Sequence, residues 1–182
     1  RIEILIHDDA STDGAQEVIR AYQKRYPDII KPILRVENQY SQGITNISGA
    51  FNFPRAVGKY VALTDGDDYW CDDYKLQRQV DYMEEHPECG FTFHSAKVVT
   101  EDGALVNGEL MRPYHASRVV KPAELVDKAI GSPFASFLLR REIVEKLPDY
   151  YVDCPVGDRP LELMAADFGD SYYFDEPMSV YR

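Results

Sequence analysis

The chain has 182 residues, of which 45% are hydrophobic and 12% aromatic, enough to bury the core of one globular domain. Lys and Arg number 20 against 31 Asp and Glu, and the formal net charge of -11 argues against binding to nucleic acid or to an anionic membrane surface. No apolar run reaches the roughly 20 residues of a membrane span. Three widely spaced cysteines predict neither a disulfide framework nor a zinc site, so we expect a cytoplasmic protein.

The first half of the chain alternates between predicted strands and helices. Apolar runs predict strands over Ile2–Ile6, Ile33–Asn38 and Lys59–Thr64. Helices are predicted from Asp13 to Tyr26, over Ile47–Val57 and over Asp73–Glu85, the last with a buried stripe of Leu76, Val80 and Met83. This alternation favours a parallel sheet covered by helices on both faces.

The second half of the chain is less regular. We expect a strand over Gly90–Val99, a turn at Asp102 and Gly103, and a loop over Glu109–Val120. Next come a short helix over Lys121–Gly131, an extended segment over Phe134–Leu139, and a helix that begins on the surface with Arg140 and Arg141. A final helix over Gly157–Gly169 precedes a pair of strands over Ser171–Arg182.

Three carboxylates follow the strand predicted at Lys59–Thr64. Asp65, Asp67 and Asp68 fall within four positions, and like charges so close repel one another unless a cation compensates them. The loop is no EF-hand, because Tyr69 and Trp70 stand where that motif needs an acid and a glycine. An Asp-x-Asp pair in a loop can instead bind Mg²⁺ or Mn²⁺ and leave positions open for phosphate oxygens. A solvated surface loop is the alternative.

Three segments, taken together and in this order, resemble the landmarks of family 2 glycosyltransferases with the GT-A fold: "EILIHDDASTDG", "GKYVALTDGDDYW" and "GDRPLELMAADFG". The resemblance covers nearly the whole chain. It implies an α/β fold in which helices flank a mostly parallel sheet, without the family's first strand, which precedes this sequence. It further implies one glycosyltransferase domain over residues 1–182, with a nucleotide-sugar and metal half (1–88) and an acceptor half (89–182).

The same resemblance implies roles for the acidic residues of the first half. Asp8 or Asp9 would contact the base or ribose of a sugar nucleotide, the alternative being a carboxylate that caps the following helix. Asp65 would help to hold the ribose and the metal. Asp67, with Asp68, would bind the Mn²⁺ or Mg²⁺ ion that bridges the diphosphate.

Asp158, in "GDRPL", matches the family's general base at the start of a helix that faces the acceptor. Such a base would deprotonate the acceptor hydroxyl during an inverting displacement. A carboxylate at this position is also a good helix cap. The family usually has Glu or Gln just before this Asp, whereas this chain has Gly157.

The implied function is transfer of a sugar from a nucleotide-sugar donor, expected to be a UDP-sugar, to a hydroxyl of a glycan or lipid-linked acceptor. The expected place is the cytoplasm or the inner face of the membrane, with membrane association only through segments outside this sequence. Two alternatives stay open: a nucleotidyltransferase, which also gathers carboxylates around Mg²⁺, and a noncatalytic module that binds nucleotide-sugars or glycans.

Overall fold

The structure, a computed structural model, describes residues 1–127 and 129–182, and of residues 107–109 only the backbone. It contains two compact units. The first unit comprises residues 1–58 and 144–157, and the second comprises residues 59–143 and 158–182. Each unit combines strands with helices, so the predicted α/β class is confirmed. The predicted functional division near residue 88 stays a prediction.

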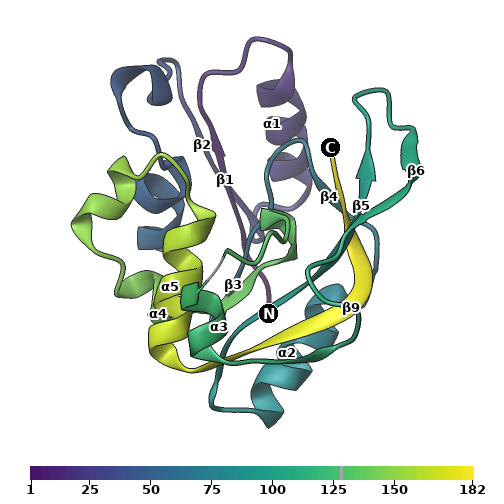
Figure 1. Ribbon diagram of the computed structural model, residues 1–182. Coiled ribbons are helices and arrows are strands. Elements are labelled where there is room, and N and C mark those ends of the chain that lie inside the picture. Colours follow the sequence, from purple (N-terminus) through teal and green to yellow (C-terminus); the bar gives the residue numbers. More distant parts are fainter. Residues whose placement is uncertain (128) are drawn as a thin grey trace. The chain divides into compact units, whose positions relative to one another are not determined.

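The first unit is built around two parallel strands, β1 (Ile4–Asp8) and β2 (Ile30–Leu34), in which Ile4 lies opposite Ile30 (Figure 1). The helix α1 (Ala15–Arg25) connects them. Asp13 accepts a hydrogen bond from the Ala15 N–H at 3.0 Å, and the basic residues of α1 fall in its last turn, where they complement the helix dipole.

The helix predicted over Ile47–Val57 is replaced by two short irregular helices. A π-helix, η2 (Ser48–Asn52), passes directly into a 3₁₀-helix, η3 (Phe53–Arg55), which contains Pro54. Proline has no N–H to donate and clashes with the preceding turn, so it kinks or breaks an α-helix at this position. The unit also contains the 3₁₀-helices η1 (Tyr40–Gln42) and η5 (Asp149–Asp153).

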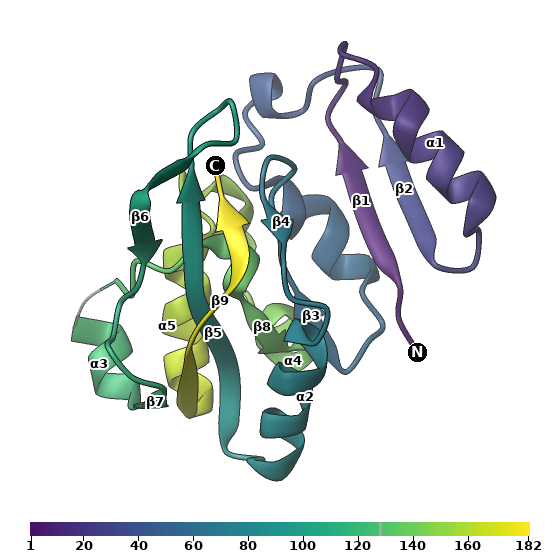
Figure 2. The same ribbon diagram turned by 90° about the vertical axis from the view of Figure 1, so that its right-hand side faces the viewer.

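The second unit contains a seven-stranded mixed sheet with the order β3-β8-β5-β9-β4, in which β6 also pairs with β5 and β7 with β9 (Figures 1 and 2). The long strands β5 (Cys89–Val99) and β9 (Asp170–Tyr181) run parallel, and the other described pairings of this sheet are antiparallel. The remaining strands are β3 (Tyr60–Ala62), β4 (Tyr69–Trp70), β6 (Leu105–Met111), β7 (Arg118–Val120) and β8 (Leu138–Arg140).

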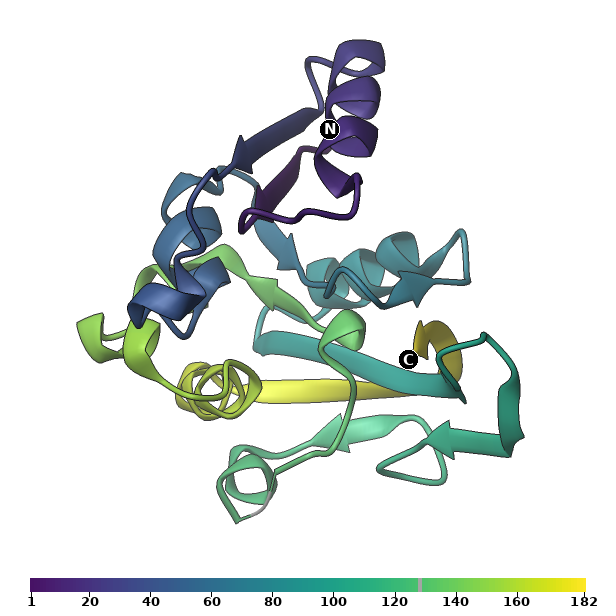
Figure 3. The same ribbon diagram turned by 90° about the horizontal axis from the view of Figure 1, so that it is seen from above.

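Helices cover both faces of this sheet. Figure 3 shows α2 (Lys75–Glu85) on one side of β5 and β9, and α3 (Pro122–Asp127) on the other. The helix α5 (Asp158–Phe168) packs against both strands. A Cβ atom at Gly90 would lie 2.5 Å from the Phe168 ring, so α5 can approach β5 this closely only because residue 90 is glycine. None of the described helices is long and apolar enough to cross a membrane.

Three predictions for the second half are wrong. The loop expected over Glu109–Val120 begins in β6 and ends in β7, and the strand pair expected at the C-terminal end is the single strand β9. Arg140 is not on the surface: it ends β8 with only 9% of its area exposed. Its guanidinium donates hydrogen bonds to the carbonyl oxygens of Cys89 and Met83 at 2.8 and 2.7 Å, and these bonds offset the hydration lost when its charge is buried. The helix that follows, α4 (Arg141–Glu145), begins at the next residue.

Candidate functional site

The acidic loop, Thr64–Asp68, connects β3 to β4 in the second unit. Both of its flanks are tied to the same short segment. The Leu63 N–H donates to the Phe137 carbonyl at 3.1 Å, and the indole N–H of Trp70 donates to the Ala135 carbonyl at 2.9 Å. The loop lies at the same end of the sheet as the C-terminal end of β9 (Figure 2). The fold therefore holds a short acidic loop between two fixed points.

The carboxylates of this loop destabilise one another. Asp65 is exposed, but the protein around it removes part of its hydration, and this desolvation together with the charges of Asp68, Asp67 and Asp158 raises the pKa of Asp65 to about 6. Desolvation and, less strongly, Asp67 raise the pKa of Asp68, although the backbone N–H and the charge of Arg182 act to lower it. The ion pairs found among the described residues include none of these four carboxylates.

Asp68 is only half satisfied. Its Oδ1 accepts a hydrogen bond from the backbone N–H of Arg182 at 3.1 Å. Its Oδ2 is buried and has no hydrogen-bond partner among the described residues. A buried carboxylate oxygen without a donor is costly, so this atom is suited to a cation or to another ligand.

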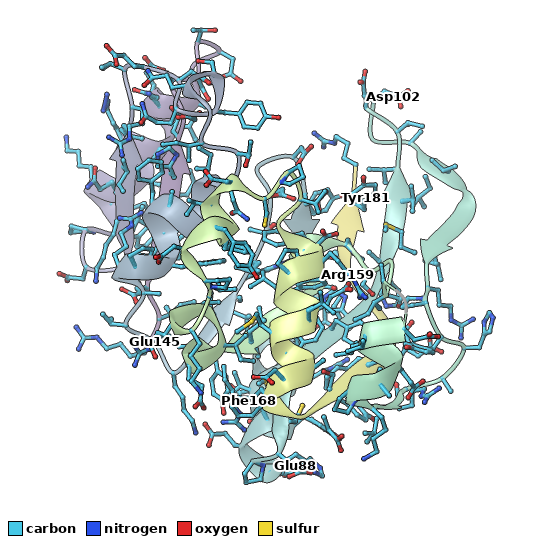
Figure 4. All side chains as sticks on the ribbon, turned by 60° about the vertical axis from the view of Figure 1, so that its left-hand side comes forward. Glu88, Asp102, Glu145, Arg159, Phe168 and Tyr181 are labelled. Atoms are coloured by element: carbon cyan, nitrogen blue, oxygen red, sulfur yellow. The ribbon has the colours of Figure 1, made fainter. Side chains whose placement is uncertain are left out.

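Asp158 is the first residue of α5 and is exposed. Figure 4 shows Arg159, in the first turn, and Phe168, in the last, at opposite ends of this helix. Asp158 Oδ1 accepts a hydrogen bond from the Arg159 N–H at 2.7 Å, so the capping alternative describes part of what this side chain does. Because the charge of Asp158 raises the pKa of Asp65, the structure brings Asp158 and the acidic loop together although they are far apart in sequence.

A partly buried ion pair fixes the beginning of α5. Arg159 pairs with Glu162 at 2.8 Å and also donates to the Leu125 and Val126 carbonyl oxygens, at 2.5 and 2.9 Å. Glu162 is 2% exposed and accepts a hydrogen bond from the Ile130 N–H at 3.4 Å. These contacts tie the turn that carries Asp158 to α3 and the segment after it.

The carboxylates of Asp8 and Asp9 lie in the first unit and already have partners. Asp8 is 6% exposed, and its Oδ1 accepts hydrogen bonds from the Ser11 N–H at 3.1 Å and from the Gln16 amide at 2.7 Å. Burial acts to raise the pKa of Asp8, but the hydrogen bonds outweigh it and lower the pKa. The two oxygens of Asp9 accept the N–H groups of Gln39 and Tyr40 at 2.8 and 2.9 Å. A ligand shared with the acidic loop stays a prediction.

The acidic loop offers carboxylate oxygens, which are ligands suited to a divalent metal ion such as Mg²⁺. Among residues 1–127 and 129–182, no three His, Cys, Asp or Glu side chains already converge into a metal site. Mg²⁺, however, is usually bound by one or two carboxylates together with water and substrate phosphates. The repulsion within the loop and the unpartnered Oδ2 of Asp68 are what such an ion would relieve.

Sequence reasoning missed a buried polar pair in α2. The predicted stripe of Leu76, Val80 and Met83 includes only one fully buried residue, whereas the buried residues of α2 are Lys75, Gln79 and Met83. Their spacing of four places these residues on one helix face, so the sequence does contain the spacing of a buried face. Lys75 and Gln79 are polar, however, and a search for apolar residues passes over them. His94 is fully buried on β5, with Nδ1 2.7 Å from the Ser95 carbonyl oxygen.

Relatives of the chain are found among bacterial proteins. An uncharacterized protein of Mycobacterium tuberculosis (strain H37Rv) is 34% identical over 189 residues, covering 100% of this chain and 50% of the relative. An uncharacterized glycosyltransferase of Nostoc sp. is 36% identical over 152 residues, or 80% of this chain and 44% of the relative. The UDP-Glc:alpha-D-GlcNAc-diphosphoundecaprenol beta-1,3-glucosyltransferase WfaP of Escherichia coli is 35% identical over 85 residues, or 46% of this chain and 30% of the relative.

The chain thus spans half or less of the length of these curated relatives. Residues 1–148 match the family described as glycosyl transferase family 2, which is well over half of the chain. The α/β architecture of the two units is consistent with the GT-A fold of that family. The chain belongs to glycosyl transferase family 2.

Proposed function

We propose that the protein is an inverting glycosyltransferase that transfers a sugar from a UDP-sugar to a hydroxyl of a glycan or lipid-linked acceptor. The observation that carries this proposal is the gathering of Asp65, Asp67, Asp68 and Asp158 in one unit, where none of the four belongs to an ion pair found among the described residues. Membership of the family supports the reaction class.

In the proposed mechanism Asp67 and Asp68 hold a Mn²⁺ or Mg²⁺ ion, and Asp65 helps to hold the ribose and this ion. The ion, when bound, supplies positive charge that stabilises the diphosphate leaving group. The free carboxylate oxygen of Asp68 and the exposed side chain of Asp67 support this assignment.

Asp158 is proposed to be the general base. It removes the proton from the acceptor hydroxyl while the hydroxyl oxygen forms a bond to the anomeric carbon of the donor sugar. The bond from that carbon to the diphosphate breaks, its electron pair leaves with UDP, and the anomeric configuration inverts. The exposure of Asp158 and its closeness to the acidic loop support this role. Arg159 and Glu162 act as positioning residues for it.

The choice of donor and acceptor rests on one named relative. The name of WfaP gives UDP-glucose as the donor and a diphosphoundecaprenol-linked sugar as the acceptor. We extend from it the use of UDP and of a lipid-linked or glycan hydroxyl to this chain. A lipid-linked acceptor would place the reaction at the inner face of the membrane. Contact of Asp8 or Asp9 with the nucleoside is proposed from the family resemblance.

The test measures UDP release from a panel of UDP-sugars in the presence of Mn²⁺. Asp67→Ala and Asp158→Asn should abolish most turnover, whereas Asp81→Asn, an exposed acid on α2, should leave it unchanged. Unchanged turnover in the first two variants would contradict the mechanism. Release of pyrophosphate in place of UDP would identify a nucleotidyltransferase, and Mn²⁺-dependent UDP binding without turnover would indicate a binding module.

A further inference from the structure

Lys75, the first residue of α2, is buried in an unusual way. Only 1% of it is exposed, and its Nζ atom donates a hydrogen bond to Gln79 Oε1 at 2.9 Å. The same atom lies 4.4 Å from the centroid of the Trp70 ring, a cation–π geometry. Lys75 forms no ion pair with a carboxylate in the described part of the chain. Burial lowers the pKa of Lys75 to about 7.

Gln79 holds Lys75 in a fixed direction. Gln79 is fully buried, and its amide nitrogen donates to the Ser136 carbonyl at 2.9 Å and to Thr92 Oγ1 at 3.2 Å. With the amide N–H groups used in this way, the amide oxygen is left to accept from Lys75. The orientation of the ammonium group is therefore set by α2, β5 and η4 (Phe134–Ser136) together.

Trp70 completes a closed set of contacts. Its indole N–H bonds to Ala135, the residue before Ser136, while Lys75 lies over the ring face. The ring is thus held both at its edge and over its face. Lys75, Gln79, the Ala135–Ser136 segment and Trp70 form a cycle that we call the Lys75 clamp.

The Lys75 clamp lies directly beside the acidic loop. Trp70 follows Asp68 by two residues and belongs to β4, a strand of only two residues that pairs with β9. So short a strand gives little independent rigidity to the loop before it. We infer that Lys75 is a positioning residue for the proposed cation site: by holding Trp70 it fixes where Asp67 and Asp68 lie. This inference rests on the proposed function.

An apolar side chain would fill the position of Lys75 at lower cost. Burying an ammonium group without a carboxylate partner is unfavourable, and proteins retain such groups chiefly where they serve a function. The titratable neighbour of Lys75 on β5 is His94. Burial and the charge of Lys75 lower the pKa of His94 to about 3, so His94 is neutral near pH 7 and supplies no second positive charge there. A purely structural role therefore predicts that a Lys75→Met variant unfolds at a lower temperature, whereas a positioning role predicts the same or a higher unfolding temperature.

The experiment compares the unaltered chain with Lys75→Met and with the control Lys59→Met, which removes an exposed lysine paired with Glu84. Thermal unfolding is recorded without metal, and UDP binding is measured by calorimetry with Mn²⁺ and with EDTA. Lys75→Met should unfold at the same or a higher temperature, yet bind UDP in the presence of Mn²⁺ about 3- to 30-fold more weakly. Binding with EDTA should not change, and Lys59→Met should behave as the unaltered chain.

Mn²⁺-supported binding that is unchanged in a folded Lys75→Met variant would overturn the inference, and so would equal weakening with and without Mn²⁺. A second measurement does not depend on the proposed function. Trp70 is the only tryptophan in the chain, so its emission in the metal-free protein reports the clamp. The emission should change between about pH 6 and pH 8 in the unaltered chain as Lys75 loses its proton, and this change should disappear in Lys75→Met.

Emission that is flat across this range would overturn the inference even if Lys75→Met failed to fold. If the unaltered chain binds UDP equally with Mn²⁺ and with EDTA, the proposed function fails while the fluorescence still decides whether the clamp exists. The two failures are therefore distinguishable.

Discussion

Two acidic segments of the molecule each follow a strand, but the carboxylates of one accept several hydrogen bonds whereas those of the other lie close to like charges. Asp8 and Asp9 follow β1 and accept hydrogen bonds from Ser11, Gln16, Gln39 and Tyr40. The carboxylates of the acidic loop belong to none of the ion pairs of the described chain, and desolvation together with neighbouring carboxylates raises the pKa of Asp65 and of Asp68. Asp8 and Asp9 stabilise the local fold. The carboxylates of the acidic loop repel one another, and a bound cation would reduce this repulsion.

This difference shows that an acidic cluster after a strand is not by itself a binding site. A carboxylate that receives backbone N–H groups contributes to stability. A carboxylate that faces other carboxylates contributes to stability only once a cation arrives. If this contrast holds, substitutions at Asp8 and Asp9 should lower stability, whereas substitutions in the acidic loop should lower activity without lowering stability.

The largest effect is expected for Asp158→Asn. Loss of a general base costs about 100- to 10,000-fold in turnover, because the acceptor hydroxyl then keeps its proton during attack. Since the Asp158 side chain is exposed, the unfolding temperature should change little. Steady-state UDP release and a thermal unfolding curve measure the two quantities. Loss of activity together with loss of folding would mean that Asp158 acts mainly as a helix cap.

Asp9→Ala should show the reverse pattern in stability. It removes both hydrogen bonds to the N–H groups of Gln39 and Tyr40, and we expect the free energy of unfolding to fall by about 1–2 kcal/mol. Asp67→Ala, which removes a repelling charge, should not lower it. Urea unfolding of the two variants side by side makes the comparison. If Asp9→Ala and Asp67→Ala lowered the free energy of unfolding equally, the proposed difference between the two acidic segments would be wrong.

The smallest effect concerns the pH dependence of stability at Asp65. Its folded pKa of about 6 lies above its unfolded value, so the folded state binds more protons between about pH 4 and pH 6, and stability falls as pH rises through this range. Asp65→Asn should therefore raise the unfolding temperature at pH 7.5 without metal, by roughly 1–3 °C because the exposed site is screened. The gain should vanish at pH 4. A gain that is the same at both pH values would contradict the assigned cause.

Much of this fold is predictable from local patterns, as the positions of α1, α2, β5 and α5 show. What local patterns could not predict depends on partners distant in sequence. The strands β6 and β7 exist because they pair with β5 and β9, and Pro54 turns an apparently regular helix into two irregular ones.

The same limit applies to the candidate site. The sequence identifies all six carboxylates, but it cannot show which of them have donors nearby, because Gln39 and Tyr40 follow Asp9 by about thirty residues. Lys75 and Gln79 were overlooked because polar residues are usually placed on the outside of a helix. Their burial becomes visible only when Trp70 and Ser136 are in place.

The most direct test of the central claim is electron paramagnetic resonance of Mn²⁺ in the presence of UDP. The signal of free Mn²⁺ should fall when the unaltered chain or Asp81→Asn is added, and should return to its full height with Asp67→Asn. A signal that stays at the height of free Mn²⁺ with the unaltered chain, or falls equally with Asp67→Asn, would show that the acidic loop does not hold the cation.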